Sequence, residues 1–336
     1  MRFLIIQTAS IGDVILATPI IEKLHRFFPG SKIDFLLKSG NESLFEGHPF
    51  LSKVIIWDKK QAKYRQFINL LKEIRAERYD RVINVQRFAS TGLITCLSNA
   101  IYSVGFNKNP LSCFFTTRVK HLITDKVTAP HEIERNLSLI AGFTDSSVIK
   151  PCLYPTSADQ QSVEIYKEKP YICIAPASLW FTKQYPADAW ADLLSKIGQD
   201  YSVYLLGSGS DNELCVYIAN KSGNPRALNL AGQLSLLQTA VLMQDAVMNY
   251  VNDSAPMHLA SAVNAPVIAI FCSTVPSFGF GPLSDDSAIV ETTTPLSCKP
   301  CGLHGLRACP RKHFRCATTI KTEQLLLNLH HDKAGF

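Results

Sequence analysis

The chain has 336 residues, of which 46% are hydrophobic and 18% are charged. This length predicts two domains, and this composition excludes a disordered or low-complexity protein. The net charge of +6 is unevenly distributed, because residues 1–150 hold 21 Lys and Arg against 13 Asp and Glu, whereas residues 151–336 hold 13 against 15. The basic first half indicates an anionic partner, such as a nucleic acid, a membrane surface or a phosphorylated ligand; ordinary solubilising charge is the alternative.

The apolar start of the chain predicts a buried strand rather than a signal peptide, because Gln7 and Thr8 interrupt it early. Two long uncharged stretches, residues 88–107 and 254–284, contain Ser, Thr, Asn, Gly or Pro every few residues. A lipid-facing helix seldom tolerates that composition. We therefore expect a cytoplasmic protein, in which the ten cysteines stay reduced.

Short apolar runs alternate with helical patterns in the first half of the chain. The expected strands are residues 3–7, 32–37, 54–57 and 81–85, and the expected helices are residues 13–28, 42–46, 64–75 and 131–141. Pro29 and Gly30 end the first helix. Residues 144–169 are polar and contain Pro151 and Pro155, so they form the best candidate for a linker.

The same alternation restarts after the linker. The expected strands are residues 171–175, 201–206, 227–230, 246–251 and 267–271, and the expected helices are residues 187–197, 211–221, 236–243 and 255–263. Pro186 is expected in the first turn of its helix. Continuous apolar strands separated by helices are typical of parallel sheets covered on both faces. The sequence therefore predicts an α/β protein with two Rossmann-like, doubly wound domains that face each other across a cleft.

Three loops that follow expected strands carry candidate chemistry, because ligands of such sheets bind at the carboxyl ends of the strands. The first loop, residues 7–13, leads directly into a helix, whose unpaired amides suit an anion. Gly12 is expected to relax this turn, and Asp13 lies at the helix start. Asp13 is either a reactive carboxylate or the cap of the helix. The loop is not a P-loop, because the Gly-Lys-Ser/Thr element is absent.

The second loop contains Ser178 and Lys183 after the strand at residues 171–175. Small residues let backbone amides approach a ligand, and a lysine supplies a point charge suited to a diphosphate. A solvent-facing lysine is the alternative. Farther along, Gly207 and Gly209 resemble part of a dinucleotide fingerprint, but Asn212 stands in place of the third glycine. That pattern gives little support to nicotinamide binding and leaves open a turn that holds a ribose or phosphate.

The third loop follows the strand at residues 246–251 and leads into the next helix. Asp253 and Ser254 are expected to cap that helix, while its first amides face the cleft. His258 lies one turn farther on, which places it on the same side of the helix as Asp253 or Ser254. The motif predicts either a plain strand–turn–helix or a phosphate cradle with a histidine beside it.

Taken together and in order, these motifs resemble the bacterial lipopolysaccharide heptosyltransferase family. The resemblance rests on residues 10–19, on residues 183–186 before a helix, and on residues 252–260. It implies the GT-B architecture, with an N-terminal acceptor-binding domain at residues 1–155 and a C-terminal nucleotide-sugar domain at residues 156–320. A C-terminal helix and tail are expected at residues 321–336.

The resemblance also implies an inverting transfer of heptose from ADP-heptose to the lipid A–Kdo inner core, without a metal or other cofactor. Asp13 is the implied catalytic base, and Ser10 and Gly12 lie on the acceptor side. The implied donor-binding residues are Ser178, Lys183, Leu234, Asp253, Ser254, Ala255 and His258. Lys183 would hold the diphosphate, Leu234 would contact the adenine, and peripheral contact with the inner face of the inner membrane is expected.

Other functions remain compatible with the residues alone. One is a transferase for another nucleotide-activated sugar in cell-surface glycan assembly. Another is a non-enzymatic basic protein that binds nucleotides or nucleic acid and carries a zinc-like tail. Nucleic acid is not expected as a partner, because the basic residues lack the interleaved spacing that reads bases.

The tail contains four clustered cysteines, at positions 298, 301, 309 and 316, which define a Cys-rich segment at residues 298–316. Cys298 and Cys301 have the two-residue spacing of a zinc knuckle, but a second pair with that spacing is absent. Structural zinc, a loop of packed thiols and a redox-labile pair are the open alternatives. The other six cysteines suit burial as small hydrophobic residues.

Overall fold

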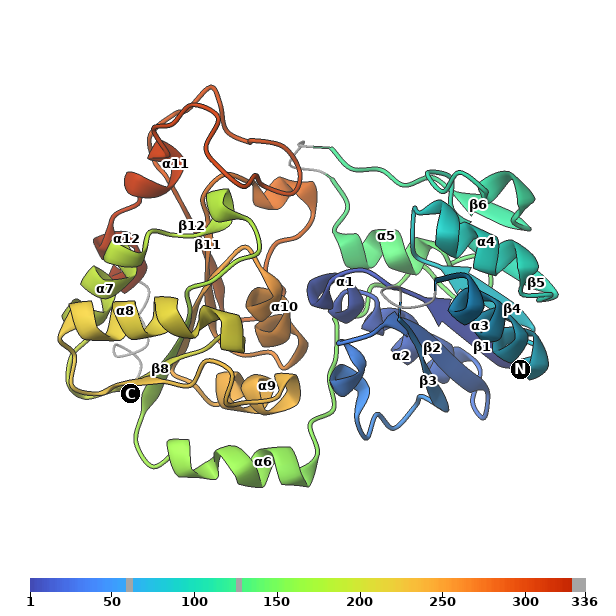
Figure 1. The fold of residues 1–336 in the computed structure, drawn as a ribbon, viewed down its shortest axis with the longest axis horizontal. Helices are drawn as coiled ribbons and strands as arrows, with labels where there is room; N and C mark the ends of the chain where they lie inside the picture. Colours follow the sequence, from blue (N-terminus) through green and yellow to red (C-terminus); the bar gives the residue numbers. More distant parts are fainter. Residues whose placement is uncertain (59–62, 125–128, 328–336) are drawn as a thin grey trace. The chain divides into compact units, whose positions relative to one another are not determined.

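The computed structural model describes residues 1–58, 63–124 and 129–327, and it divides into two compact units. Unit 1 contains residues 1–124 and 129–154, and unit 2 contains the described residues from Pro155 onward. Each unit is a six-stranded parallel sheet flanked by helices (Figure 1). No helix among the described residues is long and apolar enough to cross a membrane.

The sheet of unit 1 has the strand order β3-β2-β1-β4-β5-β6. Its strands are β1 (Arg2–Ile6), β2 (Lys32–Lys38), β3 (Lys53–Trp57), β4 (Arg81–Asn84), β5 (Tyr102–Phe106) and β6 (Thr117–Val119). The order reverses between β1 and β4, which pair directly with each other. That position is the switch point at which doubly wound sheets bind ligands.

Helices cover both faces of the unit 1 sheet (Figure 1). They are α1 (Ile11–Ile15), α2 (Thr18–Phe27), α3 (Lys63–Glu77), α4 (Ala89–Leu97) and α5 (Glu132–Ser138), with the short helices η1 (Glu42–Phe45) and η2 (Ser112–Phe114). Leu70 and Ile74 of α3 and Ile94 of α4 share one core cluster with Leu4 and Ile6 of β1.

The single helix that the sequence predicts at residues 13–28 is wrong, because the chain forms α1 and α2 instead. Pro19 lies in the first turn of α2 and has no N–H to donate to the carbonyl of Ile15. The hydroxyl of Thr18 donates to that carbonyl at 2.8 Å. The proline therefore ends α1 and begins α2, so the helix that carries Asp13 has only five residues.

The sheet of unit 2 has the strand order β12-β11-β10-β7-β8-β9. Its strands are β7 (Tyr171–Ala175), β8 (Ser202–Leu205), β9 (Ala227–Asn229), β10 (Met248–Asn252), β11 (Val267–Phe271) and β12 (Ser287–Glu291). The order reverses between β7 and β10, which pair directly. Unit 2 therefore repeats the topology of unit 1, with β7 in the place of β1 and β10 in the place of β4.

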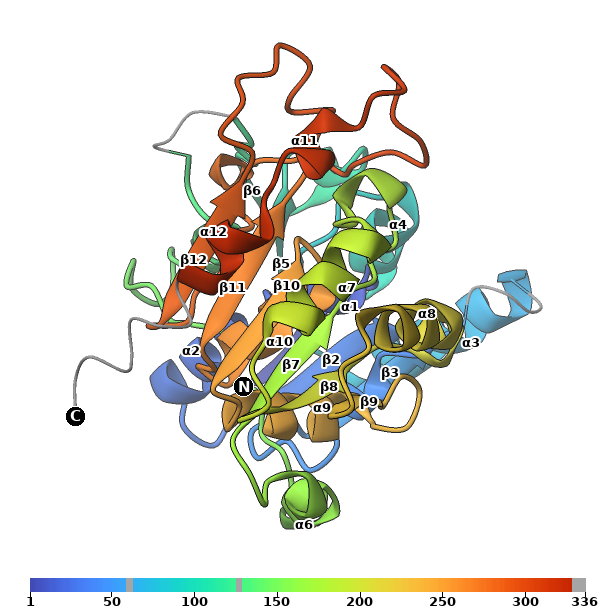
Figure 2. The same cartoon turned by 90° about the vertical axis from the view of Figure 1, so that its left-hand side faces the viewer.

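The helices of unit 2 also form a layer on each face of their sheet (Figure 2). They are α6 (Ser157–Val163), α7 (Ala187–Lys196), α8 (Asn212–Ser222), α9 (Leu236–Gln244), α10 (Ala255–Ala262), α11 (Arg315–Thr318) and α12 (Thr322–Leu326), with the short helices η3 (Glu164–Tyr166), η4 (Phe181–Lys183), η5 (Gly209–Asp211) and η6 (Pro276–Phe278). Helix α7 contacts α8 and α12, whereas α9 contacts α10 and α6.

Several elements differ from the sequence prediction. The predicted linker contains helix α6, which begins with a capping box between Thr156 and Asp159. Strands β5, β6 and β12 and helix α4 were not predicted, because they lie in or beside the long uncharged or turn-rich stretches. Pro186 is the N-cap of α7 and not a residue of its first turn. In the predicted C-terminal helix and tail, α12 lies within residues 321–327, and residues 328–336 lie outside the described residues.

Candidate functional site

The candidate site of unit 2 is built from loops at the carboxyl ends of β7, β10 and β11. Lys183 ends helix η4 in the loop after β7, and Asp253 directly follows β10. The ammonium nitrogen of Lys183 lies 2.7 Å from a carboxylate oxygen of Asp253. The sequence prediction placed both residues at this sheet edge, and the structure joins them directly.

Asp253 has a second partner that the sequence did not indicate. The hydroxyl of Thr274, in the loop after β11, donates to the Asp253 carboxylate at 2.6 Å. Only 5% of Asp253 is exposed, so the carboxylate is almost entirely removed from water. Such a charge is tolerated because a cation and a hydroxyl replace the lost hydration.

Asn252, the last residue of β10, fixes the path of the loop after β7, which carries Lys183. Its side-chain oxygen accepts a hydrogen bond from the backbone N–H of Tyr185 at 2.9 Å, and its side-chain nitrogen donates to the carbonyl of Pro176 at 2.7 Å. Asn252 is fully buried. One amide therefore holds both ends of the loop that carries Ser178 and Lys183.

The sequence predicts that Asp253 and Ser254 cap helix α10, but neither side chain does so in the structure. Ser254 occupies the N-cap position, but α10 has no side-chain cap hydrogen bond. The Ser254 hydroxyl lies 3.3 Å from the carbonyl of Asn252 and 3.5 Å from that of Ala177, beside Ser178. The cap prediction is wrong because Lys183 and Thr274 hold the Asp253 carboxylate, while the Ser254 hydroxyl is directed to backbone carbonyls.

The start of α10 offers fewer amides to an anion than its position suggests. Pro256 has no N–H, and the Met257 N–H donates to the carbonyl of Ser254 at 3.1 Å. The N–H groups of Ser254 and Ala255 are what the first turn retains for a ligand. His258 lies one turn farther on and is buried.

Leu234 lies outside this network, in the loop between β9 and α9, where it is half-buried directly before the N-cap Ser235. Its loop is held against the Gly207–Gly209 turn, because the Gly232 N–H donates to the carbonyl of Gly207 at 2.9 Å. In that turn the carboxylate of Asp211 accepts from the N–H and hydroxyl of Ser208.

In unit 1, Asp13 lies in the third position of α1, and Ser10 is the N-cap. The Asp13 carboxylate accepts from the Ser10 N–H at 3.2 Å and from the Ser10 hydroxyl. Gly12 is buried inside the helix and does not have a positive φ. The prediction that it relaxes the turn is therefore wrong. Asp13 therefore lies at the start of the helix and bonds back to the N-cap residue.

A buried polar cluster at the carboxyl ends of β1 and β4 was not predicted from the sequence. Gln7 and Gln86 join side chain to side chain, and the Gln7 oxygen also accepts from the Ala9 N–H at 3.3 Å. Asn84, at the end of β4, accepts from the Gln86 N–H at 2.8 Å. The available signal was a polar residue at the end of each apolar strand, Gln7 directly after β1 and Asn84 as the last residue of β4. The cluster fixes the loop that leads into α1.

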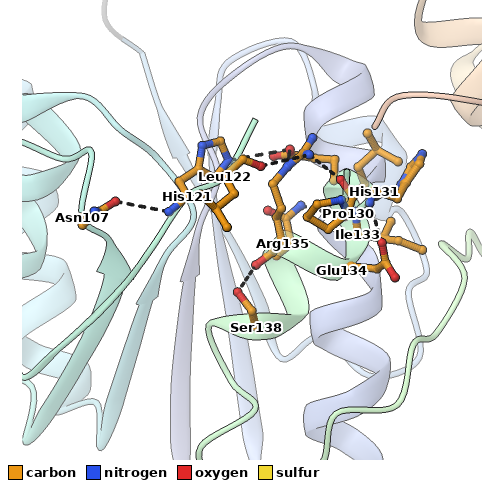
Figure 3. Close-up of polar contacts among 12 residues, drawn as sticks. Asn107, His121, Leu122, Pro130, His131, Ile133, Glu134, Arg135 and Ser138 are labelled. Carbon is orange, nitrogen blue, oxygen red and sulfur yellow. Dashed lines mark hydrogen bonds and ion pairs between the residues drawn. The ribbon is translucent and has the colours of Figure 1, made fainter. Parts of the chain in front are cut away.

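Helix α5 supports the turn between α1 and α2. Asn136 donates to the carbonyl of Leu16 at 3.0 Å. Figure 3 shows the base of α5, where Arg135 reaches the carbonyls of Pro130 and Leu122. Arg135 also donates to the Glu132 carboxylate at 2.6 Å. Burial alone would raise the pKa of Glu132, but the contacts with His121 and Arg135 outweigh it and lower that pKa.

The Cys-rich segment does not form a metal cage in the described part of the chain, where no group of three or more His, Cys, Asp or Glu side chains is arranged to hold an ion. All ten cysteines lie in the described residues, and none forms a disulfide. The Sγ of Cys298 lies 3.8 Å from Nε2 of His313, and the thiol of Cys301 donates to the carbonyl of Cys298 at 3.2 Å.

Known proteins resemble this chain in both sequence and fold. It is 26% identical over 277 residues to lipopolysaccharide heptosyltransferase 3 of Escherichia coli, covering 78% of this chain and 81% of that protein. It is 24% identical over 341 residues to lipopolysaccharide heptosyltransferase 1 of Pseudomonas aeruginosa, covering 97% and 93%. The structure of E. coli ADP-heptose lps heptosyltransferase II superposes with a TM-score of 0.79 at 21% identity, covering 98% of each chain.

The two-unit fold is thus the GT-B fold of the solved heptosyltransferases. The model of glycosyltransferase family 9 (heptosyltransferase) matches residues 67–305, which include Lys183, Asp253 and Thr274. Asp13 precedes that range, but it lies within the longer alignment with the Pseudomonas aeruginosa protein, which covers 97% of this chain. With the family matched over most of the chain, the protein belongs to glycosyltransferase family 9, the heptosyltransferases, and is a sugar transferase.

Proposed function

We propose that this chain transfers a heptose from ADP-heptose to the lipid A–Kdo inner core of lipopolysaccharide. The relatives that share its family are named for heptose transfer to lipopolysaccharide or lipooligosaccharide. The observation that carries the proposal is the Lys183–Asp253–Thr274 network at the switch point of unit 2, where a doubly wound sheet binds its nucleotide.

The donor is assigned to unit 2. Lys183 places a positive charge that would be drawn to the diphosphate, and the amides of Ser254 and Ala255 add hydrogen-bond donors at the start of α10. Ser178 and His258 would line the phosphates or the sugar, and Leu234 would contact the adenine. Asp253 would keep the hydroxyl of Thr274 when Lys183 turns to the ligand.

The acceptor is assigned to unit 1, with Asp13 as the general base and with Ser10 and Gly12 in the same turn. The acceptor hydroxyl oxygen attacks the anomeric carbon of the donor while its proton passes to the Asp13 carboxylate. The bond between that carbon and the diphosphate breaks, and ADP leaves with the bonding pair. Attack opposite the leaving group inverts the anomeric configuration. Lys183 stabilises the negative charge that develops on the diphosphate.

The decisive experiment is Asp13→Asn, assayed with ADP-heptose and a lipid A–Kdo acceptor. Turnover is expected to fall by a factor of about 10²–10⁴, the usual contribution of a general base, with ADP affinity unchanged. The matched control is Asp159→Asn, because Asp159 accepts from the N–H and hydroxyl of Thr156 at the start of α6, just as Asp13 does from Ser10.

Full turnover in Asp13→Asn contradicts its role as the base. An equal loss in both variants assigns the effect to helix capping. The donor is tested separately by measuring the melting temperature of the wild-type protein with ADP-, UDP- and GDP-sugars. Stabilisation by the ADP-sugar is expected. Stabilisation by UDP- or GDP-sugars alone contradicts the heptose assignment.

A further inference from the structure

The Cys-rich segment, residues 298–316, is fastened to the carboxyl end of β11. The Cys301 N–H donates to the carbonyl of Ser273 at 2.8 Å. The ammonium group of Lys299 donates to the carbonyl of Phe271 at 2.8 Å and pairs with Glu291 of β12 at 2.7 Å. Figure 2 shows the segment looping beyond the end of the unit 2 sheet before it reaches α11. It is therefore bound to the loop that carries Thr274.

The same segment is also bound to the loop that carries Lys183. The Leu306 N–H donates to the hydroxyl oxygen of Thr182 at 2.8 Å, and the Thr182 N–H donates to the carbonyl of Leu306 at 3.1 Å. The Ser273 hydroxyl donates to the same Thr182 oxygen at 2.9 Å. Thr182 and Ser273 are both fully buried. One hydroxyl thus joins three stretches of chain that are far apart in the sequence.

Gly305 brings the segment close to the stem of Lys183. A Cβ atom at Gly305 would lie 3.0 Å from Cγ of Lys183 and 3.1 Å from Cβ of Trp180. Its φ of +77° also belongs to the left-handed region that side chains disfavour. The backbone of the segment therefore packs where any larger residue would push on the lysine.

Thr182 precedes Lys183, and Ser273 precedes Thr274, so each residue of the buried junction lies next to one partner of Asp253. We propose that the Cys-rich segment positions the donor site: through Thr182 and Gly305 it holds Lys183, and through Ser273 it holds Thr274. This inference rests on the proposed function, since it assumes that the nucleotide binds at Lys183. Thr182 and Gly305 are positioning residues and do not touch the ligand.

The test is Thr182→Val, which keeps the shape of the side chain and leaves the Leu306 N–H and the Ser273 hydroxyl without their acceptor. ADP is the binding probe, measured by calorimetry on the full chain. The dissociation constant for ADP and the KM for the donor are expected to rise at least fivefold. Thr182→Ser, which restores the hydroxyl, is expected to bind ADP within twofold of the wild type.

The control is Thr91→Val, since Thr91 is also fully buried and its hydroxyl donates to the carbonyl of Phe88 at 2.9 Å, in unit 1 and not in the donor loops. It is expected to lower the melting temperature as Thr182→Val does, with ADP affinity within twofold of the wild type. Normal ADP affinity in Thr182→Val, or equal losses in both valine variants, overturns the positioning role.

Lys183→Gln separates this inference from the proposed function. If Lys183→Gln weakens ADP binding and Thr182→Val does not, the donor site stands and the positioning role is wrong. If Lys183→Gln binds ADP like the wild type, or the wild type does not bind ADP, the donor assignment is wrong and the inference falls with it. Gly305→Ala, expected to act in the same direction as Thr182→Val, provides a second variant at the junction.

Discussion

The carboxylate of Asp253 depends on partners that come from two different loops, Lys183 on one side and Thr274 on the other. Removing one member of a buried ion pair leaves an unpaired charge, which costs about 3–5 kcal/mol of stability. This free energy is the cost of breaking the pair, and it is not the stability that the intact pair contributes. A ligand that draws Lys183 away must offset this cost with its own negative charge.

The burial of His48 predicts that the free energy of unfolding decreases in acid. His48 is buried among aromatic rings, its Nδ1 accepts from the Phe50 N–H at 3.2 Å, and its Nε2 lies 4.0 Å from a Glu22 oxygen. Burial lowers the pKa of His48 from 6.5 to about 4. As the pH falls, the imidazole is therefore protonated in the unfolded chain before it is protonated in the folded protein. The contribution of His48 to the free energy of unfolding is fully present above pH 6.5 and is lost as the pH drops toward 4.

The full shift corresponds to about 3 kcal/mol of unfolding free energy. Denaturant unfolding of His48→Asn between pH 7 and 4 is expected to show a shallower pH dependence than the wild type. Thr95→Val, a change at a buried residue of unit 1 that removes no titratable group, is the control and should keep the wild-type slope. Identical slopes for His48→Asn and the wild type contradict the assignment. Burial raises the pKa of the neighbouring Glu22, so its titration enters the same profile.

Cys309 is expected to be more reactive than Cys301 in the same segment. Burial acts to raise the pKa of the Cys309 thiol, but hydrogen bonds from the backbone N–H groups of residues 311–314 outweigh it and lower that pKa. Burial raises the pKa of Cys301. Since the thiolate is the nucleophile, iodoacetamide at pH 7 should alkylate Cys309 ahead of Cys301, as followed by peptide mass spectrometry. The reverse order contradicts the prediction.

At the scale of elements, two loops of unit 2 touch through glycine. Gly232 has a φ of +76°, and a Cβ there would lie 2.7 Å from Cα of Gly209. Gly223, which ends α8, has a φ of +63° with nothing within 4 Å of a Cβ. The two sites share a left-handed backbone but differ in the space around it.

Gly223→Ala is therefore expected to cost about 1–2 kcal/mol, the usual strain of the left-handed region. Gly232→Ala is expected to cost about 1–3 kcal/mol more, because the alanine must also displace the Gly209 backbone. Urea unfolding of both variants measures the difference. Equal losses would show that the loops separate freely. A larger loss at Gly232 supports a fixed path for the loop that carries Leu234.

Element prediction succeeded where burial was continuous. Strands β7 and β11 have the predicted bounds, because both are buried along their whole length between turn residues. It failed where one residue changed the hydrogen bonding, as Pro19 did by dividing α1 from α2. Helix α6 was missed because its short polar sequence has no apolar period, although Thr156 and Asp159 carried the capping signal.

The site was predictable as far as strand order placed it. Lys183 and Asp253 follow strands that lie side by side, so their meeting at one edge follows from the topology. Thr274 and Thr182 were not predictable, because a hydroxyl after a strand carries no periodic signal. Their roles depend on contacts between loops from three separate stretches of chain.

At the scale of the whole molecule, the basic half of the chain predicts binding to anionic surfaces. We expect the protein to sediment with phosphatidylglycerol vesicles at low salt and to be released at 0.5 M NaCl, about where screening shortens to a few ångströms. Neutral phosphatidylcholine vesicles are the control. Hydrogen exchange on the vesicles should protect peptides from residues 1–154. Protection confined to unit 2, or binding that does not depend on salt, contradicts this expectation.

The two sheets share one strand order, so the loop after β1 and the loop after β7 are topological equivalents. In one half that loop supplies a carboxylate, Asp13, and in the other an ammonium group, Lys183. Asparagine ends the neighbouring strand in both halves, as Asn84 and Asn252. The chain therefore uses a single scaffold twice, and the corresponding loops of the two copies carry side chains of opposite charge. This difference would account for the proposed division of labour, in which one copy takes up a proton and the other holds an anion.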